Sequence, residues 1–259
     1  MNLNLEPFVK EKTLLFTVTS DGYKYFTWNL YKFFETVKPS VPLCILCLDR
    51  ESYDFFNRIA FLPSRPFFME GARLEHKTPA LFGTTPFKRM NRMKLKALLE
   101  LSQRQEIETL VYIDSDIALF KDPIPDLQQE LEKCPLHFQC DEFKQNDYVC
   151  SSVTGCPNAC TGVIAMRLTE ETRPVFKTLY SIDETWRQAI TDQDYINTRL
   201  HSIPVVYQTL PRDRYPNGIF LSENRYKTGD AVLLHFNQIV GMEKKRFMKN
   251  KGCWLLDVA

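Results

Sequence analysis

Two carboxylates that could bind a metal ion, Asp114 and Asp116, stand next to an apolar run that begins at Leu110. Such a run predicts a strand buried on both faces, as in a parallel sheet between helices. Ligand sites in such sheets lie at the carboxyl ends of strands, and residues i and i+2 of an extended chain point the same way. The pair therefore favours Mn²⁺ or Mg²⁺, whereas two solvated aspartates in a turn are the simpler interpretation of these residues taken alone.

A histidine and a lysine near the end of the chain could complete this site. His235 closes an apolar stretch that starts at Ala231, which predicts another strand end. Gly241 and Lys244 follow it, where a backbone amide and an ammonium group could contact a diphosphate. A lone buried histidine is more often a core residue, but His235 and Asp116 could also converge on one cation.

The clearest predicted helix spans residues 87–104, with Lys94 on its apolar stripe. The stripe consists of Met90, Met93, Ala97, Leu98 and Leu101. Lys94 either lies at the edge of the core with its charged end in water or contacts a phosphate group.

The first predicted unit is a strand at 13–19, a turn at Gly22 and a helix that reaches about Phe34. A strand at 43–48 and a helix at about 52–61 follow. This order is typical of a nucleotide-binding α/β unit, but the turn matches neither known glycine-rich phosphate loop. A diphosphate bound here would therefore need a metal ion.

Three further segments of the second half carry candidate residues. A strand at 137–140 leads into Asp141, and Gly162 begins another strand, where the backbone could approach a ligand closely. A helix is predicted from about Thr169 to Ile190. Thr191 or Asp192 then caps the next helix, and capping is the simpler role for Asp192.

Eight cysteines are present, and free buried thiols are the favoured interpretation. Cys44 and Cys47 lie on a predicted strand, where residues i and i+3 face opposite sides and cannot share one zinc ion. A zinc site is a weaker alternative, because its four cysteines lack a paired C-x₂-C spacing. Its members would be Cys140, Cys150, Cys156 and Cys160.

The bulk composition is that of an ordinary globular protein, with 44% hydrophobic and 25% charged residues. A net charge of +1 gives no indication of nucleic-acid binding. No apolar run approaches the roughly 20 residues that span a bilayer, and no signal peptide is evident. We expect a cytoplasmic protein of one domain, residues 1–259. Its halves would be about 1–125 for the nucleotide and about 126–259 for the acceptor and the completion of the metal site.

Taken in order, these motifs resemble the nucleotide-diphospho-sugar transferase family. They are a Lys94-bearing helix, Asp114-Ser-Asp116, Cys160-Thr-Gly162, Asp192-Gln193, and Leu234-His235-Phe-Asn237 followed by Gly241 and Lys244. The family consists of glycosyltransferases of the GT-A fold, related to plant cell-wall xylosyl- and galactosyltransferases. The resemblance implies a mixed, mainly parallel sheet flanked by helices. It also implies Mn²⁺ (or Mg²⁺), a UDP-sugar donor of a pentose such as xylose or of a hexose, and a glycan hydroxyl as acceptor.

The resemblance also implies roles for individual residues. The metal would be held by Asp114, Asp116 and His235. The uridine and ribose would lie near Thr17, Thr19 and Tyr23, and the diphosphate near Lys94, Gly241 and Lys244. The sugar and reaction centre would be served by Asp141, Thr161, Gly162, Asp192 and Gln193, with Ser115 and Asn237 beside the donor. If the reaction inverts the sugar, Asp192 is the first candidate for the base and Asp141 the second. Many relatives have asparagine where this chain has Cys160.

Two other classes fit parts of the pattern. A haloacid-dehalogenase-like phosphatase also has a strand followed by D-x-D, but it usually has Thr or Val where this chain has Ala118, and its motif usually opens the domain. A non-catalytic module that binds sugar nucleotides or glycans would keep the binding residues without transfer. The Golgi lumen is the alternative compartment, for a form that has lost its anchor. The sequence carries no signal for the oligomeric state.

Overall fold

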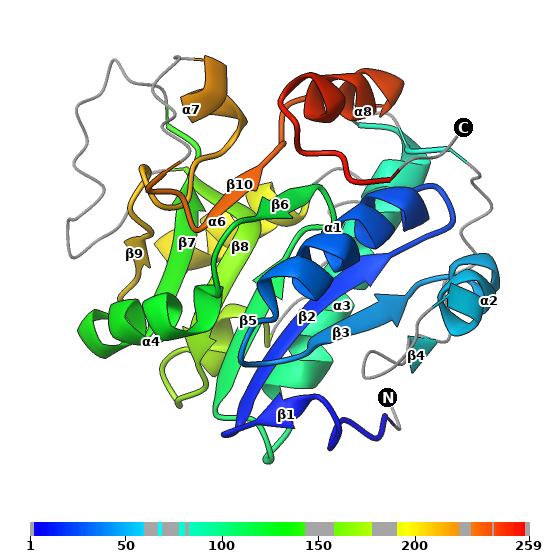
Figure 1. Ribbon diagram of the computed structural model, residues 1–259. Coiled ribbons are helices and arrows are strands. Elements are labelled where there is room, and N and C mark those ends of the chain that lie inside the picture. The colour runs from blue at the N-terminus through cyan, green and yellow to red at the C-terminus, as the bar shows by residue number, and fades with distance from the viewer. Residues whose placement is uncertain are drawn as a thin grey trace.

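The computed structural model describes residues 3–59, 67–68, 78–80, 83–142, 158–177, 191–222, 229–239 and 241–256. These residues form one α/β domain in which helices cover both faces of a mixed sheet, and a second, two-stranded sheet lies beside it (Figure 1). In the described part of the chain, no helix is long and apolar enough to pass through a membrane.

The main sheet has eight strands in the order β4-β3-β2-β5-β8-β7-β9, with β1 paired to β2. β2 is parallel to β3 and to β5, whereas β8 is antiparallel to both of its neighbours, β5 and β7. The strands β5 and β7 therefore run in the same direction. The bounds are β1 Val9–Lys10, β2 Thr13–Thr19, β3 Leu43–Cys47, β4 Phe67–Phe68, β5 Thr109–Ile113, β7 Leu136–Cys140, β8 Ala159–Arg167 and β9 Gln208–Thr209.

Helices pack on both faces of this sheet, and Figure 1 shows α1 in front of it and α3 behind it. Leu98 of α3 and Ile196 of α6 belong to the core on one face, and Leu30 of α1, Leu127 of α4 and Met248 of α8 to the core on the other. The bounds are α1 Lys24–Val37, α2 Arg50–Ile59, α3 Thr85–Ser102, α4 Pro123–Lys133, η1 Arg173–Val175, α6 Asp192–Ser202, α7 Gly218–Ser222 and α8 Gly241–Asn250.

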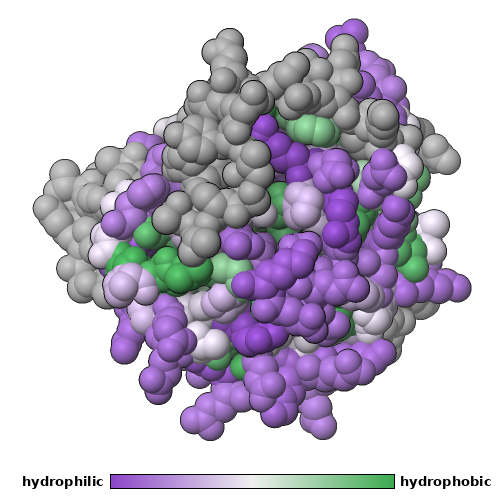
Figure 2. All heavy atoms as spheres, turned by 90° about the vertical axis from the view of Figure 1, so that its left-hand side faces the viewer, coloured by the Kyte–Doolittle hydropathy of each residue, from purple (hydrophilic) through white to green (hydrophobic). Residues whose placement is uncertain are grey.

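The side chains of each strand alternate between the two cores because successive side chains point to opposite faces of a sheet. On β2, Leu14 and Phe16 face one core and Leu15 faces the other. On β3, Cys44 and Cys47 lie on opposite faces, as predicted, and both thiols are free. Figure 2 shows that the described residues on the face at the left of Figure 1 are mostly hydrophilic, with small hydrophobic patches.

The second sheet pairs β6, Ile117–Leu119, with β10, Leu233–His235, and Ile117 lies opposite His235. The structure corrects the expectation that the chain is extended through Asp114 and Asp116. β5 ends at Ile113, the chain turns at 114–116, and β6 leaves the main sheet. Asp114 and Asp116 therefore point to one place because a turn brings them together and not because the chain is extended.

Most predicted elements are confirmed with shifted ends. The predicted helix at 87–104 is α3, with Met93 and Leu98 of its apolar stripe buried. The helix predicted from Thr169 is wrong for its first turns, where the structure has only the short η1, with Pro174 inside it. Residues 178–190 lie outside the described residues, as do two cysteines of the zinc alternative, Cys150 and Cys156.

The topology places several site candidates at one edge of the sheet. The carboxyl ends of β5 and β7 meet there, and so does the first part of the antiparallel β8. Asp114 follows β5, Asp141 follows β7, and Thr161 lies early in β8.

Candidate active site

A cavity of about 580 Å³ opens at this edge. Most residues predicted for the site line it, and they come from the start of α1, the turn after β5, the end of β7, the first part of β8, the start of α6, the end of β10, and the helices α3 and α8. They are Tyr23, Lys94, Asp114, Ser115, Asp116, Asp141, Thr161, Gly162, Asp192, Gln193, His235, Asn237 and Lys244. A chamber of this size is large enough for a small-molecule ligand.

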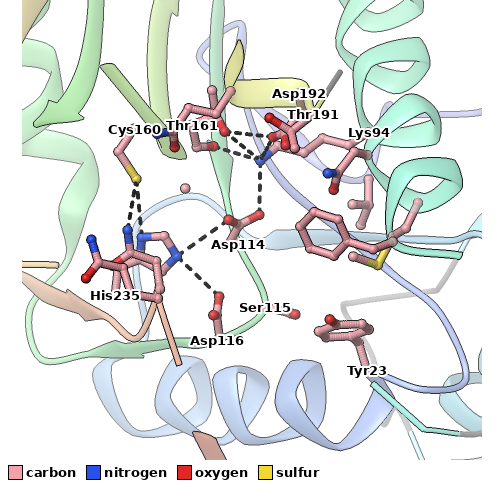
Figure 3. Close-up of a pocket in the computed structure, with 18 of the residues that line it drawn as sticks. Tyr23, Lys94, Asp114, Ser115, Asp116, Cys160, Thr161, Thr191, Asp192 and His235 are labelled. Carbon is pink, nitrogen blue, oxygen red and sulfur yellow. Dashed lines mark hydrogen bonds and ion pairs between the residues drawn. The ribbon is translucent and has the colours of Figure 1, made fainter. Parts of the chain in front are cut away.

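Asp114, Asp116 and His235 converge in this cavity (Figure 3). His235 Nε2 lies 3.5 Å from Asp114 Oδ2 and 3.4 Å from Asp116 Oδ1. One potential ligand atom from each residue lies within 4.8 Å of the other two. The pairing of β6 with β10 produces this convergence, because it places His235 beside the residue that follows Asp116.

Each of these carboxylates turns its other oxygen toward a cation of the protein. Asp114 Oδ1 accepts a hydrogen bond from Lys94 Nζ at 3.2 Å and another from the Tyr112 hydroxyl. Asp116 Oδ2 forms a short ion pair with Lys244 Nζ. The oxygens that face His235 are therefore held in place by contacts at the opposite oxygens.

The charges of this cluster depend on one another. Burial alone would raise the pKa of Asp116, but Lys244 and His235 hold that pKa well below its ordinary value. Burial opposes a charged imidazole, yet Asp116 and Asp114 raise the pKa of His235 well above its ordinary value. The electric field of the two carboxylates at Nε2 thus strongly favours positive charge.

The donor set fits a divalent cation. Two carboxylate oxygens and an imidazole nitrogen are the ligands offered by Asp114, Asp116 and His235. Carboxylates suit Mg²⁺ and Mn²⁺, and imidazole suits transition metals, so these three residues fit a divalent cation that accepts both kinds of ligand.

Lys94 lies inside the cavity wall and not at the edge of the core, since only 4% of it is exposed. Its ammonium group lies 2.7 Å from Asp192 Oδ2, donates to the Thr161 carbonyl at 2.8 Å and reaches Asp114. Burial would lower the pKa of Lys94, but Asp114 and Asp192 raise it above its ordinary value. Lys94 therefore stays charged and ties the turn after β5 to α6.

Asp192 is free for the cavity because its neighbour caps the helix. The Thr191 hydroxyl accepts a hydrogen bond from the backbone N–H of Asp194. The Asp194 carboxylate accepts one from the backbone N–H of Thr191, which completes a capping box. Asp192 Oδ2 instead accepts from the Thr161 hydroxyl at 2.7 Å. Of the two predicted caps, Thr191 is the observed one.

Asp141 is surrounded by side-chain amides. Its Oδ1 accepts hydrogen bonds from Asn217 and Asn237, both at 3.0 Å, and its Oδ2 accepts from Gln193 at 3.1 Å. Within the described part of the chain, Asp141 has no ion pair with a lysine or arginine.

Gly162 makes room for His235. A β-carbon at Gly162 would lie 1.9 Å from His235 Cε1, well inside contact distance. The group seen to approach this glycine closely is a protein side chain, and the predicted approach to a ligand stays a prediction.

Three predicted residues do not line the cavity. Thr17 and Thr19 are buried in β2, where the Thr27 hydroxyl donates to Thr19 at 2.8 Å, and only Val18 between them reaches the cavity. Gly241 begins α8 without lining the cavity.

Several lining residues were not predicted as site residues, and Asn91 is one of them. Asn91 of α3 is 5% exposed, and its Nδ2 has no hydrogen-bond partner among the described residues. It precedes Lys94 by three positions and therefore lies on the same side of the helix. That spacing was the signal available in the sequence.

Known glycosyltransferase structures share this architecture. The galactosyltransferase LgtC, solved with donor and acceptor sugar analogues, superposes with a TM-score of 0.56 at 12% identity, over 94% of this chain and 97% of that one. Mouse xyloside xylosyltransferase 1, in its apo form, superposes with a TM-score of 0.55 at 13% identity, over 86% of this chain and 97% of that one. A glycosyltransferase involved in glycosylation of the major capsid of PBCV-1 superposes with a TM-score of 0.51 at 12% identity, over 92% of this chain and 98% of that one. At these identities the likeness shows the GT-A fold alone.

A comparison with curated proteins finds no match. The profile of a sequence family does match, over residues 41–248, which is most of the chain. That span contains the carboxylates of the turn after β5, His235 and Lys244. The fold and the resemblance noted from the motifs agree with it, and the chain belongs to the nucleotide-diphospho-sugar transferase family.

Proposed function

We propose that this protein is a divalent-cation-dependent glycosyltransferase that moves a sugar from a UDP-sugar to a hydroxyl group of a glycan acceptor. The observation that carries the proposal is the meeting of Asp114, Asp116 and His235 in a cavity of about 580 Å³ next to the buried Lys244. Mn²⁺ is the proposed cation, because two carboxylates and one imidazole suit it.

Asp114 Oδ2, Asp116 Oδ1 and His235 Nε2 would hold the cation. When bound, the cation supplies Lewis-acid chemistry that offsets negative charge on a leaving diphosphate. Lys244 lines the same cavity and is paired with the other oxygen of Asp116. Its ammonium group stands where it can add a second positive charge near the diphosphate.

A second group of lining residues suits a neutral sugar. Asp141, Gln193 and Asn237 form a network of carboxylate and amide groups, and such groups bind hydroxyls by hydrogen bonds. Asn91 Nδ2, which has no partner among the described residues, is assigned as one more donor. Tyr23 contributes an aromatic ring to the lining, which we assign to the nucleoside.

Asp141 and Asp192 are the proposed catalytic residues, and the geometry reverses their predicted order. Asp192 is engaged by Lys94 and by the Thr161 hydroxyl. Among the described residues, the Asp141 carboxylate accepts hydrogen bonds from neutral amides, so its negative charge is less compensated and we rank it first as the group that takes the acceptor proton.

The donor sugar stays open between a pentose and a hexose. By their names, the structural neighbours include a galactosyltransferase and a xylosyltransferase, so the shared fold accommodates both classes.

The experiment is a panel of UDP-sugars assayed with and without Mn²⁺ for thermal stabilisation and for release of UDP. Stabilisation by one donor that requires Mn²⁺, together with slow hydrolysis or transfer of the sugar, is the expected result. Stabilisation with no release of UDP under any condition would favour the non-catalytic binding module. A phosphoenzyme trapped on Asp114 would favour the phosphatase, against which family membership already argues.

A further inference from the structure

The imidazole of His235 occupies a slot between two strands of the main sheet. The β7–β8 ladder is irregular there: Phe138 pairs with Ile164 but the next residue, Gln139, pairs with Cys160, so residues 161–163 of β8 lie between these two partners. Such irregularities re-aim side chains and end regular pairing. The absent β-carbon of Gly162 leaves space for the ring.

Gln139 forms the polar end of this slot. It has no exposed surface, and its Oε1 lies 2.9 Å from His235 Nδ1. Its Nε2 donates to the Tyr215 carbonyl at 3.1 Å. A carbonyl can only accept, so this second bond determines which end of the amide is the nitrogen and leaves the oxygen facing His235.

The thiol of Cys160 is the other group near Nδ1, at 3.8 Å. Sulfur is a weak acceptor, and the amide oxygen is closer by nearly an ångström. Gln139 is therefore the principal partner of Nδ1.

We propose that Gln139 is a positioning residue that keeps a proton on His235 Nδ1 and so presents an unprotonated Nε2 to the divalent cation. A neutral imidazole carries one proton, and the hydrogen bond at one nitrogen decides which nitrogen can bind a metal. This inference rests on the proposed function, because it assigns a role toward the same cation.

Two substitutions separate this role from a structural one. Gln139→Met keeps a similar shape and removes the acceptor, whereas Gln139→Glu keeps an acceptor for Nδ1. Both lose the donor to the Tyr215 carbonyl, so their difference isolates the contact with His235. Gln128→Met, at an exposed position of α4, is the matched control.

The first readout is Mn²⁺ affinity, measured from the electron paramagnetic resonance signal of free Mn²⁺. We expect an approximately 10- to 100-fold loss in Gln139→Met, as is usual for partners of metal-binding histidines, and near wild-type affinity in Gln139→Glu and in the control. The second readout is the nitrogen modulation of bound Mn²⁺ in electron spin-echo spectra. It should be present in the wild type, lost in His235→Ala and weakened in Gln139→Met. Thermal unfolding without Mn²⁺ checks that each variant is folded.

A double variant tests whether Gln139 acts through His235. If it does, Gln139→Met causes no further loss of Mn²⁺ affinity when His235 is already alanine. Additive losses, or equal losses in the Met and Glu variants, would overturn the positioning role while leaving the metal site intact. Unchanged Mn²⁺ affinity in His235→Ala would overturn the proposed metal site itself, and this inference with it.

Discussion

The carboxyl ends of β5 and β7 point to the same edge of the sheet, and an aspartate follows each strand. After β5, Asp114 and Asp116 meet Lys94, Lys244 and the imidazole of His235. That end of the cavity contains charged side chains of both signs, and one oxygen of each carboxylate faces His235 Nε2.

After β7, Asp141 meets neutral groups. Among the described residues, its carboxylate accepts hydrogen bonds from the side-chain amides of Asn217, Asn237 and Gln193. The same residue type at the same edge is therefore placed in two different environments. The first suits a cation and phosphates and the second suits hydroxyl groups, which is the division that a charged leaving group and a neutral sugar require.

The largest expected effect comes from Asp116→Ala. Loss of this carboxylate removes a metal ligand and leaves Lys244 buried without its partner. We expect Mn²⁺-dependent transfer to fall by about 1,000-fold, since metal-ion catalysis contributes several kcal/mol and each 1.4 kcal/mol is a factor of ten. Steady-state rates at saturating Mn²⁺ measure this, with the exposed Asp230→Ala as control. Undiminished transfer would show that Asp116 does not hold a cation needed for the reaction, and the charged site would lose its proposed role.

Lys244→Met should separate chemistry from cation binding. We expect turnover to fall by about 100-fold, the usual cost of removing one group that stabilises developing charge. Mn²⁺ affinity should not fall, because the substitution removes a positive charge that competes for Asp116. Parallel measurements of turnover and Mn²⁺ binding test this, with the exposed Lys249→Met as control. A matching loss of both quantities would show that Lys244 only organises the metal ligands.

Asp141→Asn should affect the other strand end alone. The substitution is nearly isosteric but removes the charge that three amides stabilise, and we expect transfer to fall by about tenfold or more. Mn²⁺ affinity should stay at the wild-type value. If Mn²⁺ binding weakened as strongly as it does in Asp116→Ala, the two strand ends would have to be treated as one site.

Asn91→Leu should give the smallest effect. Its Nδ2 has no partner among the described residues, so replacement should leave the free energy of unfolding unchanged or raise it slightly. We expect KM for the donor or the acceptor to rise about fivefold, the value of one neutral hydrogen bond of about 1 kcal/mol. Kinetics with each substrate varied in turn identify which ligand Asn91 contacts, and an unchanged KM for both would remove it from the site.

Much of the fold was predictable because the hydrophobic pattern of most segments matches the strand or helix that they form. The apolar runs and the stripe on α3 predicted buried strands and a helix, and the family resemblance is confirmed by the profile match. The end of β5 near Asp114 was expected, but the separate strand β6 was not predictable. The run continues as apolar residues through Phe120, and only the pairing of β6 with a strand far along the chain draws it away from the main sheet.

The residues of the site were predicted more fully than the contacts between them. Asp114, Asp116 and His235 could be named from residue type and strand ends, and the structure brings them together. Gln139 could not be named, because a glutamine in an apolar strand carries no signal of its own. Its role depends on the β7–β8 irregularity and on the histidine that enters there, and both are tertiary features.

The short β6–β10 sheet has a thermodynamic consequence. It joins Ile117 to His235 although almost half of the chain lies between them, so the three proposed metal ligands are neighbours only in the folded protein. A ligand that binds only the folded state stabilises it, by about 2.7 kcal/mol at roughly 100 times its dissociation constant. A cation held there would act as a non-covalent crosslink between distant parts of the chain, and its concentration would set the melting temperature as well as the rate of the reaction.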